Sequence, residues 1–139
     1  MLFVHQSRID KPVERVFAFH ERPDALAKLV PPWQKVEIVQ PPSSLAPGTR
    51  VVLKMKLGPF WRTWVAEHTF YEPGVLFQDV MRAGPFKRWV HTHRFLRDDG
   101  RTLLRDEIDF EAPLGLSLLF VPSLRRAFAF RHAVTAREC

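Results

Sequence analysis

The sequence contains a single cysteine, Cys139, at its last position, so no disulfide can form within the chain. No apolar run exceeds four residues, whereas a membrane-spanning helix needs about 20, so we expect no transmembrane segment. The first residues, MLFVHQSRID, lack the basic start and the apolar core of a secretion signal, and we therefore expect a cytoplasmic protein. Asparagine is absent and 12 residues are proline, a bias typical of a GC-rich genome or of a heat-adapted protein.

Several motifs that carry common chemistry are also missing. The sequence has no GxGxxG or Walker-type loop to hold phosphates, and no GxSxG turn to present a nucleophilic serine. It has no HExxH pair, and its one cysteine lies at the frayed end of the chain. We therefore predict neither a cofactor nor a metal centre.

The charge balance is positive, with 21 Lys and Arg against 15 Asp and Glu and a pI near 10.1. An excess of this sign suits nucleic acid, anionic lipid or acidic ligands. The basic residues are scattered, however, and the longest basic runs are pairs such as Lys87-Arg88 and Arg125-Arg126. Because there is no basic stripe and no reader motif, we predict no nucleic-acid partner.

The sequence does contain the material for a core, since 46% of its residues are hydrophobic and 17 are aromatic. Alternation, helical spacing and turn residues predict a single α+β domain over residues 1–139, with two short helices after the first strand. The expected strands are 2–10, 36–40, 49–57, 61–71, 75–82, 87–98 and 101–111, followed by a long helix over 113–137, bent or restarted near Pro122. The long helix is the only large apolar element that can cover the sheet, through Leu116, Phe120, Leu124, Ala127, Phe128 and Val134.

The turn Asp99-Gly100 is a strong hairpin signal and fixes the register of the last two strands. It pairs Asp98 with Arg101, and side chains alternate between the two faces from there outward. The inward pairs are then Phe95 with Leu104, His93 with Asp106, His91 with Ile108 and Trp89 with Phe110.

The turn Pro73-Gly74 predicts a second hairpin in the same way. Its expected pairs are Tyr71 with Leu76, Phe70 with Phe77, His68 with Asp79 and Ala66 with Met81. Parity also allows Asp79 to lie near His91. The inner wall of the sheet is thus predicted to carry a polar band of His68, Asp79, His91, His93 and Asp106, framed by Trp64, Phe70, Phe77, Trp89, Phe95 and Phe110.

Two His–Asp pairs on an apolar face are unusual, because a buried carboxylate without a partner is costly. Three interpretations remain open from the sequence. The pairs can be satisfied core contacts that fix the strand register, or the polar lining of a ligand cavity, or a catalytic or metal site. Alternation along a strand does allow His91 and His93 to face one site, but no cysteine ligand or metal motif accompanies them.

The chain resembles a family over nearly its whole length. The runs PVERVFAFHERPDALAKLVPPW, LAPGTRV, LGPFWRTWVAEH, FQDVMRAGPFKRWVHTHRF and DEIDFEAPLG are similar to a bacterial, polyketide cyclase/dehydrase-like branch of the SRPBCC (START-like, helix-grip) superfamily. The resemblance implies a seven-stranded antiparallel sheet curled around a long C-terminal helix, with an apolar cavity between them. Similar domains occur fused to sugar-nucleotide epimerase-like proteins, so such a protein is a candidate partner. The resemblance transfers no catalytic motif.

These observations lead to a first hypothesis, binding or transport of a small hydrophobic, lipid-like molecule by a monomer or homodimer. The expected ligand-binding residues are Trp64, His68, Phe70, Phe77, Asp79, Trp89, His91, His93, Phe95, Asp106, Phe110, Phe120, Leu124 and Phe128. A second hypothesis is a cyclase/dehydratase-type enzyme in which His91 or His93 moves a proton and Asp79 or Asp106 orients it. A third is peripheral contact with a membrane or a protein through the apolar segment LGLSLLFVPSLRRAFAF.

Overall fold

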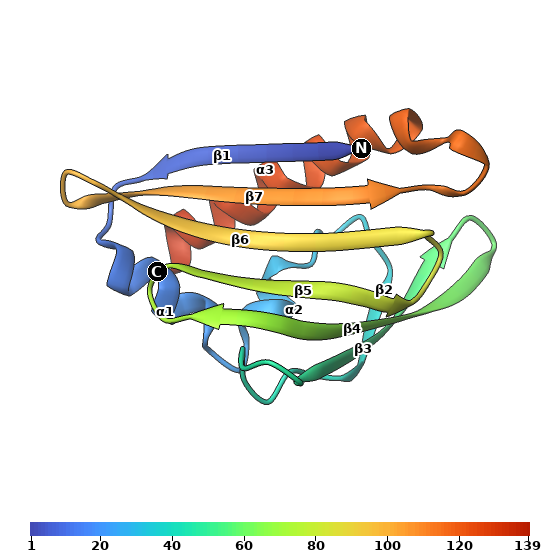
Figure 1. The fold of residues 1–139 in the computed structure, drawn as a ribbon, viewed down its shortest axis with the longest axis horizontal. Coiled ribbons are helices and arrows are strands. Elements are labelled where there is room, and N and C mark those ends of the chain that lie inside the picture. Colours follow the sequence, from blue (N-terminus) through green and yellow to red (C-terminus); the bar gives the residue numbers. More distant parts are fainter.

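The seven strands form one antiparallel sheet whose order is β1-β7-β6-β5-β4-β3-β2 (Figure 1). The computed structural model describes residues 1–139. The strands are β1 (Leu2–Ile9), β2 (Val36–Gln40), β3 (Arg50–Leu57), β4 (Phe60–Glu72), β5 (Leu76–Ala83), β6 (Arg88–Asp98) and β7 (Arg101–Glu111). The α-helices are α1 (Val13–His20), α2 (Ala25–Leu29) and α3 (Val121–Glu138). The predicted α+β helix-grip architecture is confirmed.

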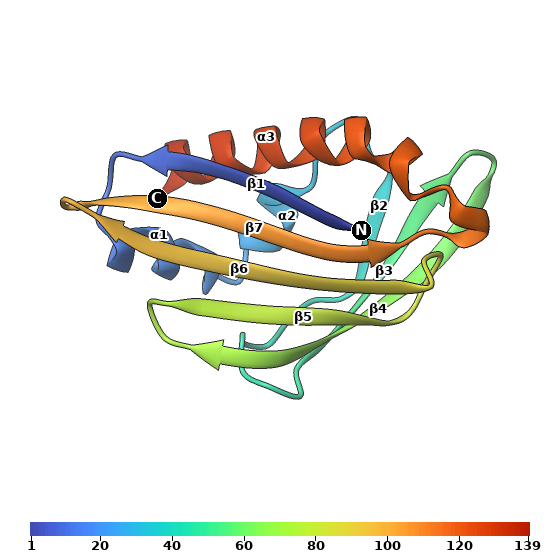
Figure 2. The same cartoon turned by 45° about the horizontal axis from the view of Figure 1, so that its top comes forward.

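Helix α3 covers the inner face of the sheet, and it packs against β1, α1 and α2 (Figure 2). Along β7 the inward side chains alternate from Leu104 through Asp106 to Ile108 and Phe110, all of them buried. Leu104 belongs to a core around α1, whereas Ile108 and Phe110 belong to a core under the first half of α3. Asp106 therefore lies in a polar layer between two apolar cores. None of the helices combines the length and the apolar character needed to cross a bilayer.

The predicted long helix over 113–137 is wrong in its first part. Residues 113–120 form two 3-10 turns, η1 (Pro113–Gly115) and η2 (Ser117–Phe120), before α3 begins at Val121. Leu114 has a positive φ of 58°, which an α-helix does not allow, and Pro122 lies in the first turn of α3, where proline is favoured. As a result Leu116 is 43% exposed and does not contribute to the inner face as expected.

The β6–β7 register is confirmed, including the pairs His93–Asp106 and His91–Ile108. The predicted contact of Asp79 with His91 is also confirmed, because the two residues pair between β5 and β6. In the β4–β5 hairpin, His68 pairs with Asp79 and Ala66 with Met81, as expected.

The outer part of the β4–β5 hairpin differs from the prediction. A register shift between His68 and Phe70 pairs Phe70 with Gln78 and Tyr71 with Phe77. The extra residue, Thr69, donates its hydroxyl hydrogen to Gln78 Oε1 at 3.0 Å. A β-bulge moves every following side chain to the opposite face. Phe70 is therefore 51% exposed instead of lining the inner wall, and Tyr71 packs on the core in its place.

Candidate functional site

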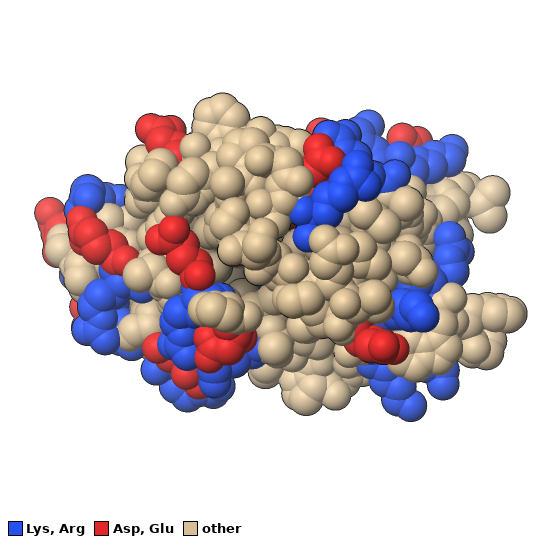
Figure 3. Space-filling view, turned by 90° about the horizontal axis from the view of Figure 1, so that it is seen from below, with Lys and Arg blue, Asp and Glu red and all other residues tan.

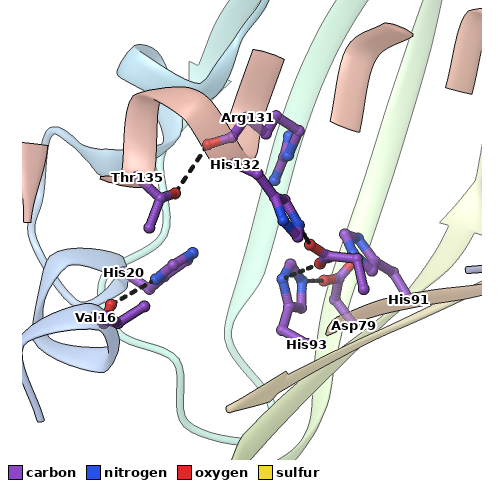
Figure 4. A network of polar contacts seen from close by, with 9 residues as sticks. Val16, His20, Asp79, His91, His93, Arg131, His132 and Thr135 are labelled. Carbon is purple, nitrogen blue, oxygen red and sulfur yellow. Dashed lines mark hydrogen bonds and ion pairs between the residues drawn. The ribbon is translucent and has the colours of Figure 1, made fainter. Parts of the chain in front are cut away.

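The carboxylate of Asp106 is the centre of the polar layer, and histidines from two elements donate to it. Figure 4 labels these two histidines, His91 and His132, together with Asp79 and His93. His91 Nε2 on β6 lies 2.7 Å from Asp106 Oδ1, and His132 Nε2 on α3 lies 2.6 Å from Oδ2. His93 Nδ1 is 3.1 Å from Oδ1. Burial by itself raises the pKa of Asp106, but these three histidines hold it well below its usual value. Asp106 is thus a buried anion.

His93 lies between two carboxylates. Its Nδ1 faces Asp106, and its Nε2 donates to Asp79 Oδ2 at 3.1 Å. A histidine that donates from both ring nitrogens carries a positive charge. Burial alone lowers the pKa of His93, yet the two carboxylates outweigh it and the pKa is raised. For Asp79, burial raises the pKa but the bond from His93 and the nearby histidines bring it to about 2. Asp79 is therefore an anion, and its contact with His93 favours the protonated form of that ring.

The two outer histidines of the layer hold the arrangement in place. Burial, and then the charge of His93, lower the pKa of His91, so that it is neutral and donates its single proton to Asp106. Its ring stacks on that of His93, with centroids 3.7 Å apart. His132 donates from Nε2, and its Nδ1 lies 2.6 Å from Ser7 Oγ, whose hydroxyl donates to it when the ring is neutral. The layer thereby links β1, β6, β7 and α3.

Two further histidines have a ring nitrogen that is left unpaired. His68 on β4 is buried, and its Nδ1 has no hydrogen-bond partner. His20 at the end of α1 bonds through Nδ1 to the carbonyl oxygen of Val16 at 2.8 Å, and no partner contacts its Nε2. Burial lowers the pKa of His20 to about 3, so the ring is neutral and Nε2 is an acceptor. Both rings contact Phe77, at centroid distances of 5.9 and 6.0 Å.

All six histidines of the chain gather in this region, although they come from β1, α1, β4, β6 and α3. His5 stacks edge-on against His132, with centroids 4.5 Å apart. Arg131 on α3 is half-buried, and Figure 4 shows it pointing, like His20, toward the space above His93. Burial lowers its pKa, while Asp106 and Asp79 act in the opposite direction. The site therefore brings two carboxylate anions together with His93, whose protonated form they favour, and with one guanidinium.

Sequence reasoning missed His20, Arg131 and His132 as site residues. A signal for His132 was present, because it lies four residues after Phe128, which was correctly expected on the inner face of the helix. His20 similarly lies four residues after the buried Val16. Nothing in the spacing, however, shows that α1 and α3 bring these side chains to the same strand pair.

The structure divides the aromatic residues of the predicted inner wall into two groups. Phe77, Phe95 and Phe128 are buried near the polar layer, with Phe77 stacked on His93 at 4.0 Å and Phe128 edge-on to His91 at 5.3 Å. The others, which lie farther toward the start of α3, are Trp64, Trp89, Phe110 and Phe120. They form a group that also contains Phe86, and Leu124 packs against this group.

A depression of about 400 Å³ lies away from the histidines, where Trp33 and Lys35 before β2 meet the end of β3. Figure 3 shows a further hollow near the middle of the face seen there.

Three side chains of the polar layer lie close enough together to hold a metal ion. Asp79, His91 and His93 each offer one ligand atom, and these three atoms lie within 4.8 Å of one another. Two imidazoles and one carboxylate are a ligand set that several divalent metals accept.

A model of the family described as polyketide cyclase/dehydrase and lipid transport matches residues 9–129. No curated protein matches the chain. Among solved structures, the chain is similar to part of a nucleoside-diphosphate sugar epimerase from Corynebacterium glutamicum, with 28% identity and a TM-score of 0.74. This match covers 97% of the present chain but only 28% of the epimerase chain.

Two other solved structures share the fold at lower identity. An aromatase/cyclase from a Streptomyces species is 18% identical with a TM-score of 0.74, over 99% of this chain and 92% of that one. Norcoclaurine synthase from Thalictrum flavum, solved with dopamine and hydroxybenzaldehyde, is 13% identical with a TM-score of 0.72, over 99% of this chain and 84% of that one. At these identities the likeness shows the fold alone.

Proposed function

The chain belongs to the polyketide cyclase/dehydrase and lipid transport family, and from this premise we propose that it binds a small, mostly apolar molecule carrying one hydroxyl group. The molecule would lie between the sheet and α3, with its hydroxyl at the His–Asp layer and its apolar part against aromatic rings. Such a mixture of apolar walls and a few polar groups is typical of small-molecule sites.

The observation that carries this proposal is the unpaired Nδ1 of His68. Buried polar atoms in folded proteins almost always have a partner, and leaving one without a partner costs about 1–3 kcal/mol. In the same layer His91, His93 and His132 all have hydrogen-bond partners, and His68 Nδ1 is the buried side-chain atom that has none. A ligand group that completes the bonding of His68 accounts for the exception.

The polarity of the site favours a hydroxyl over a carboxylate. The free Nε2 of His20 is an acceptor, to which a hydroxyl or phenol can donate and an ionised carboxylate cannot. The same hydroxyl oxygen can accept a bond from His68 Nδ1 when that nitrogen is protonated.

Isothermal titration calorimetry with naphthol and with naphthalene tests this proposal. We expect naphthol to bind more tightly than naphthalene, and His68→Phe to weaken naphthol about tenfold, the equivalent of one hydrogen bond. Binding of naphthalene should be unchanged in that variant. Phe70→Ser is the matched control on the same strand, because its ring is exposed on the outer face.

Equal affinity for the two compounds, or unchanged naphthol binding by His68→Phe, would contradict the proposal. Native mass spectrometry of the protein purified from cell extract adds a check on ligand class. A retained organic mass is expected, whereas retention of only a divalent ion would assign the layer to a metal.

A second candidate function, a dehydratase or cyclase, is favoured by the contrast between His93 and His20. Their rings lie 6.4 Å apart, the pKa of His93 is raised and that of His20 is about 3. Environments that separate two pKa values in this way are typical of acid and base pairs. His20 would take a proton next to a carbonyl, while the Nε2 proton of His93 passes from its contact with Asp79 to the leaving hydroxyl, which departs as water.

Absorbance of the enone formed from a β-hydroxy ketone measures this reaction directly. We expect His20→Phe and His93→Gln each to reduce turnover by about a hundredfold or more, the usual contribution of acid–base catalysis. If both variants keep their turnover, or if the parent protein shows no turnover, the dehydratase or cyclase function is excluded and binding remains as the proposed function.

A further inference from the structure

The segment between β7 and α3 exposes leucines that have no packing role. Leu114, Leu118 and Leu119 are 87%, 72% and 70% exposed, and they lie in the turns η1 and η2. Single exposed leucines are common, but three within six residues of one segment are not explained by the core. Contiguous exposed apolar surface of this kind marks a site of interaction.

The tip of the β3–β4 hairpin lies at the same end of the molecule, as Figures 1 and 2 both show, and it exposes apolar side chains. Phe60 is 70% exposed, Trp61 52% and Leu57 40%. The ring of Phe86 packs against both segments, because it contacts Phe120 of η2 at a centroid distance of 5.0 Å and Trp64 of β4 at 5.8 Å. We refer to Leu57, Phe60, Trp61, Leu114, Leu118 and Leu119 as the apolar end.

Cations without acidic partners lie on the chain segments that adjoin the apolar end. Lys56 and Arg62 adjoin the hairpin tip, Lys87 precedes β6 and Arg125 lies in the first turns of α3. All four are exposed, and none takes part in an ion pair. Figure 3 shows uncharged side chains projecting from this end with Lys and Arg beside them. The net charge of +6 agrees in sign with an anionic partner.

We propose that the apolar end docks on the surface of an anionic lipid bilayer. The leucines and Phe60 would enter the boundary between headgroups and acyl chains, while Lys56, Arg62, Lys87 and Arg125 contact lipid phosphates. Trp61 is the residue type that favours this boundary. The apolar side chains come from two separate turns, and the cations lie on the segments that adjoin them, which suits a fluid surface with phosphates better than the flat apolar face of a protein partner. The inference does not depend on the ligand proposed above.

Flotation with lipid vesicles tests the docking surface. At low salt we expect the protein to float with vesicles of equal phosphatidylcholine and phosphatidylglycerol, and not with phosphatidylcholine alone. High salt should release it, since surface charges are screened. The double variant Leu118→Glu with Leu119→Glu should lose at least tenfold in vesicle affinity. Leu96→Glu is the matched control, because Leu96 is 42% exposed near the other end of β6.

Three results would overturn the proposal. The parent protein does not bind phosphatidylglycerol vesicles at low salt, or the double variant binds as the parent does, or Leu96→Glu loses as much affinity as the double variant. Light scattering after size exclusion gives the competing outcome. A dimer of the parent that the double variant dissociates, in the absence of vesicle binding, would assign the apolar end to a second copy of this chain. Circular dichroism spectra identical to those of the parent would show that the variants are folded.

Discussion

Asp106 on β7 and His132 on α3 are joined by a hydrogen bond of 2.6 Å, which ties the C-terminal helix to the centre of the sheet. Both side chains are almost fully buried, so the bond lies out of water. Asp106 also accepts from His91, and His132 contacts Ser7 on β1. A single carboxylate therefore fixes the positions of the helix and two strands relative to one another.

Replacing His132 should loosen this connection without unfolding the protein. We expect His132→Phe to lower the free energy of unfolding by about 1–3 kcal/mol, because Asp106 loses one of its donors. Urea unfolding followed by tryptophan fluorescence measures the change. Ser7→Ala should cost less, and its effect should disappear in the His132→Phe background. Additive effects of the two substitutions would show that the contact between them carries no energy.

Acid should destabilise the protein well before its carboxylates titrate, because of His20. The pKa of this ring is about 3 in the folded chain and 6.5 when unperturbed, so the unfolded state binds the proton first. The stabilising contribution is fully present above pH 6.5 and is lost as the pH falls toward 3. At about pH 5 the loss amounts to about 2 kcal/mol. Asp79 adds a second loss only as the pH falls from 3.8 toward about 2.

Urea unfolding of the parent and of His20→Phe at neutral pH and at about pH 5 checks this expectation. The variant should depend less on pH over this range than the parent. The raised pKa of His93 acts in the opposite direction, since its contribution is present below 6.5 and is lost as the pH rises through the folded value. Equal pH dependence of parent and variant would show that folding does not lower the pKa of His20.

The ring of His68 should lower the free energy of unfolding when no ligand is bound. Replacing it with phenylalanine removes a buried nitrogen that has no partner, and we expect the free energy of unfolding to rise by about 1–3 kcal/mol. Thermal unfolding of the ligand-free protein measures the rise. We therefore expect His68→Phe to be more stable than the parent and to bind naphthol less tightly. A strong loss of stability would instead show that the ring is needed for packing.

Two phenylalanines that the sequence placed on the same wall should behave very differently. Phe110 has no exposed surface, and Phe110→Ala should cost about 3–5 kcal/mol through the cavity that it leaves. Phe70 is half exposed beyond the bulge, and Phe70→Ser should change stability by no more than about 0.5 kcal/mol. Urea unfolding at neutral pH gives both values. A large loss of unfolding free energy in Phe70→Ser would show that this ring is packed in the core.

The sequence by itself determined the sheet and much of its inner face. Asp99-Gly100 is a turn with a known geometry, so side-chain alternation alone places His91, His93 and Asp106 on one wall. The same reasoning failed at Phe70, because nothing local distinguishes a strand with a bulge at Thr69 from one without it. It also failed over 113–120, where apolar residues at helical spacing form exposed 3-10 turns.

Only the tertiary structure decided how the polar layer is completed. His20, Arg131 and His132 come from α1 and α3, outside the strands that carry Asp79 and Asp106, and packing of these helices on the sheet brings them to the two carboxylates. The pKa shifts depend on the same packing, because burial and neighbouring charges exist only once the chain has folded. The turns encode which residues share a face of the sheet, whereas the contacts between helix and sheet determine which of them carry charge and which nitrogen has no partner.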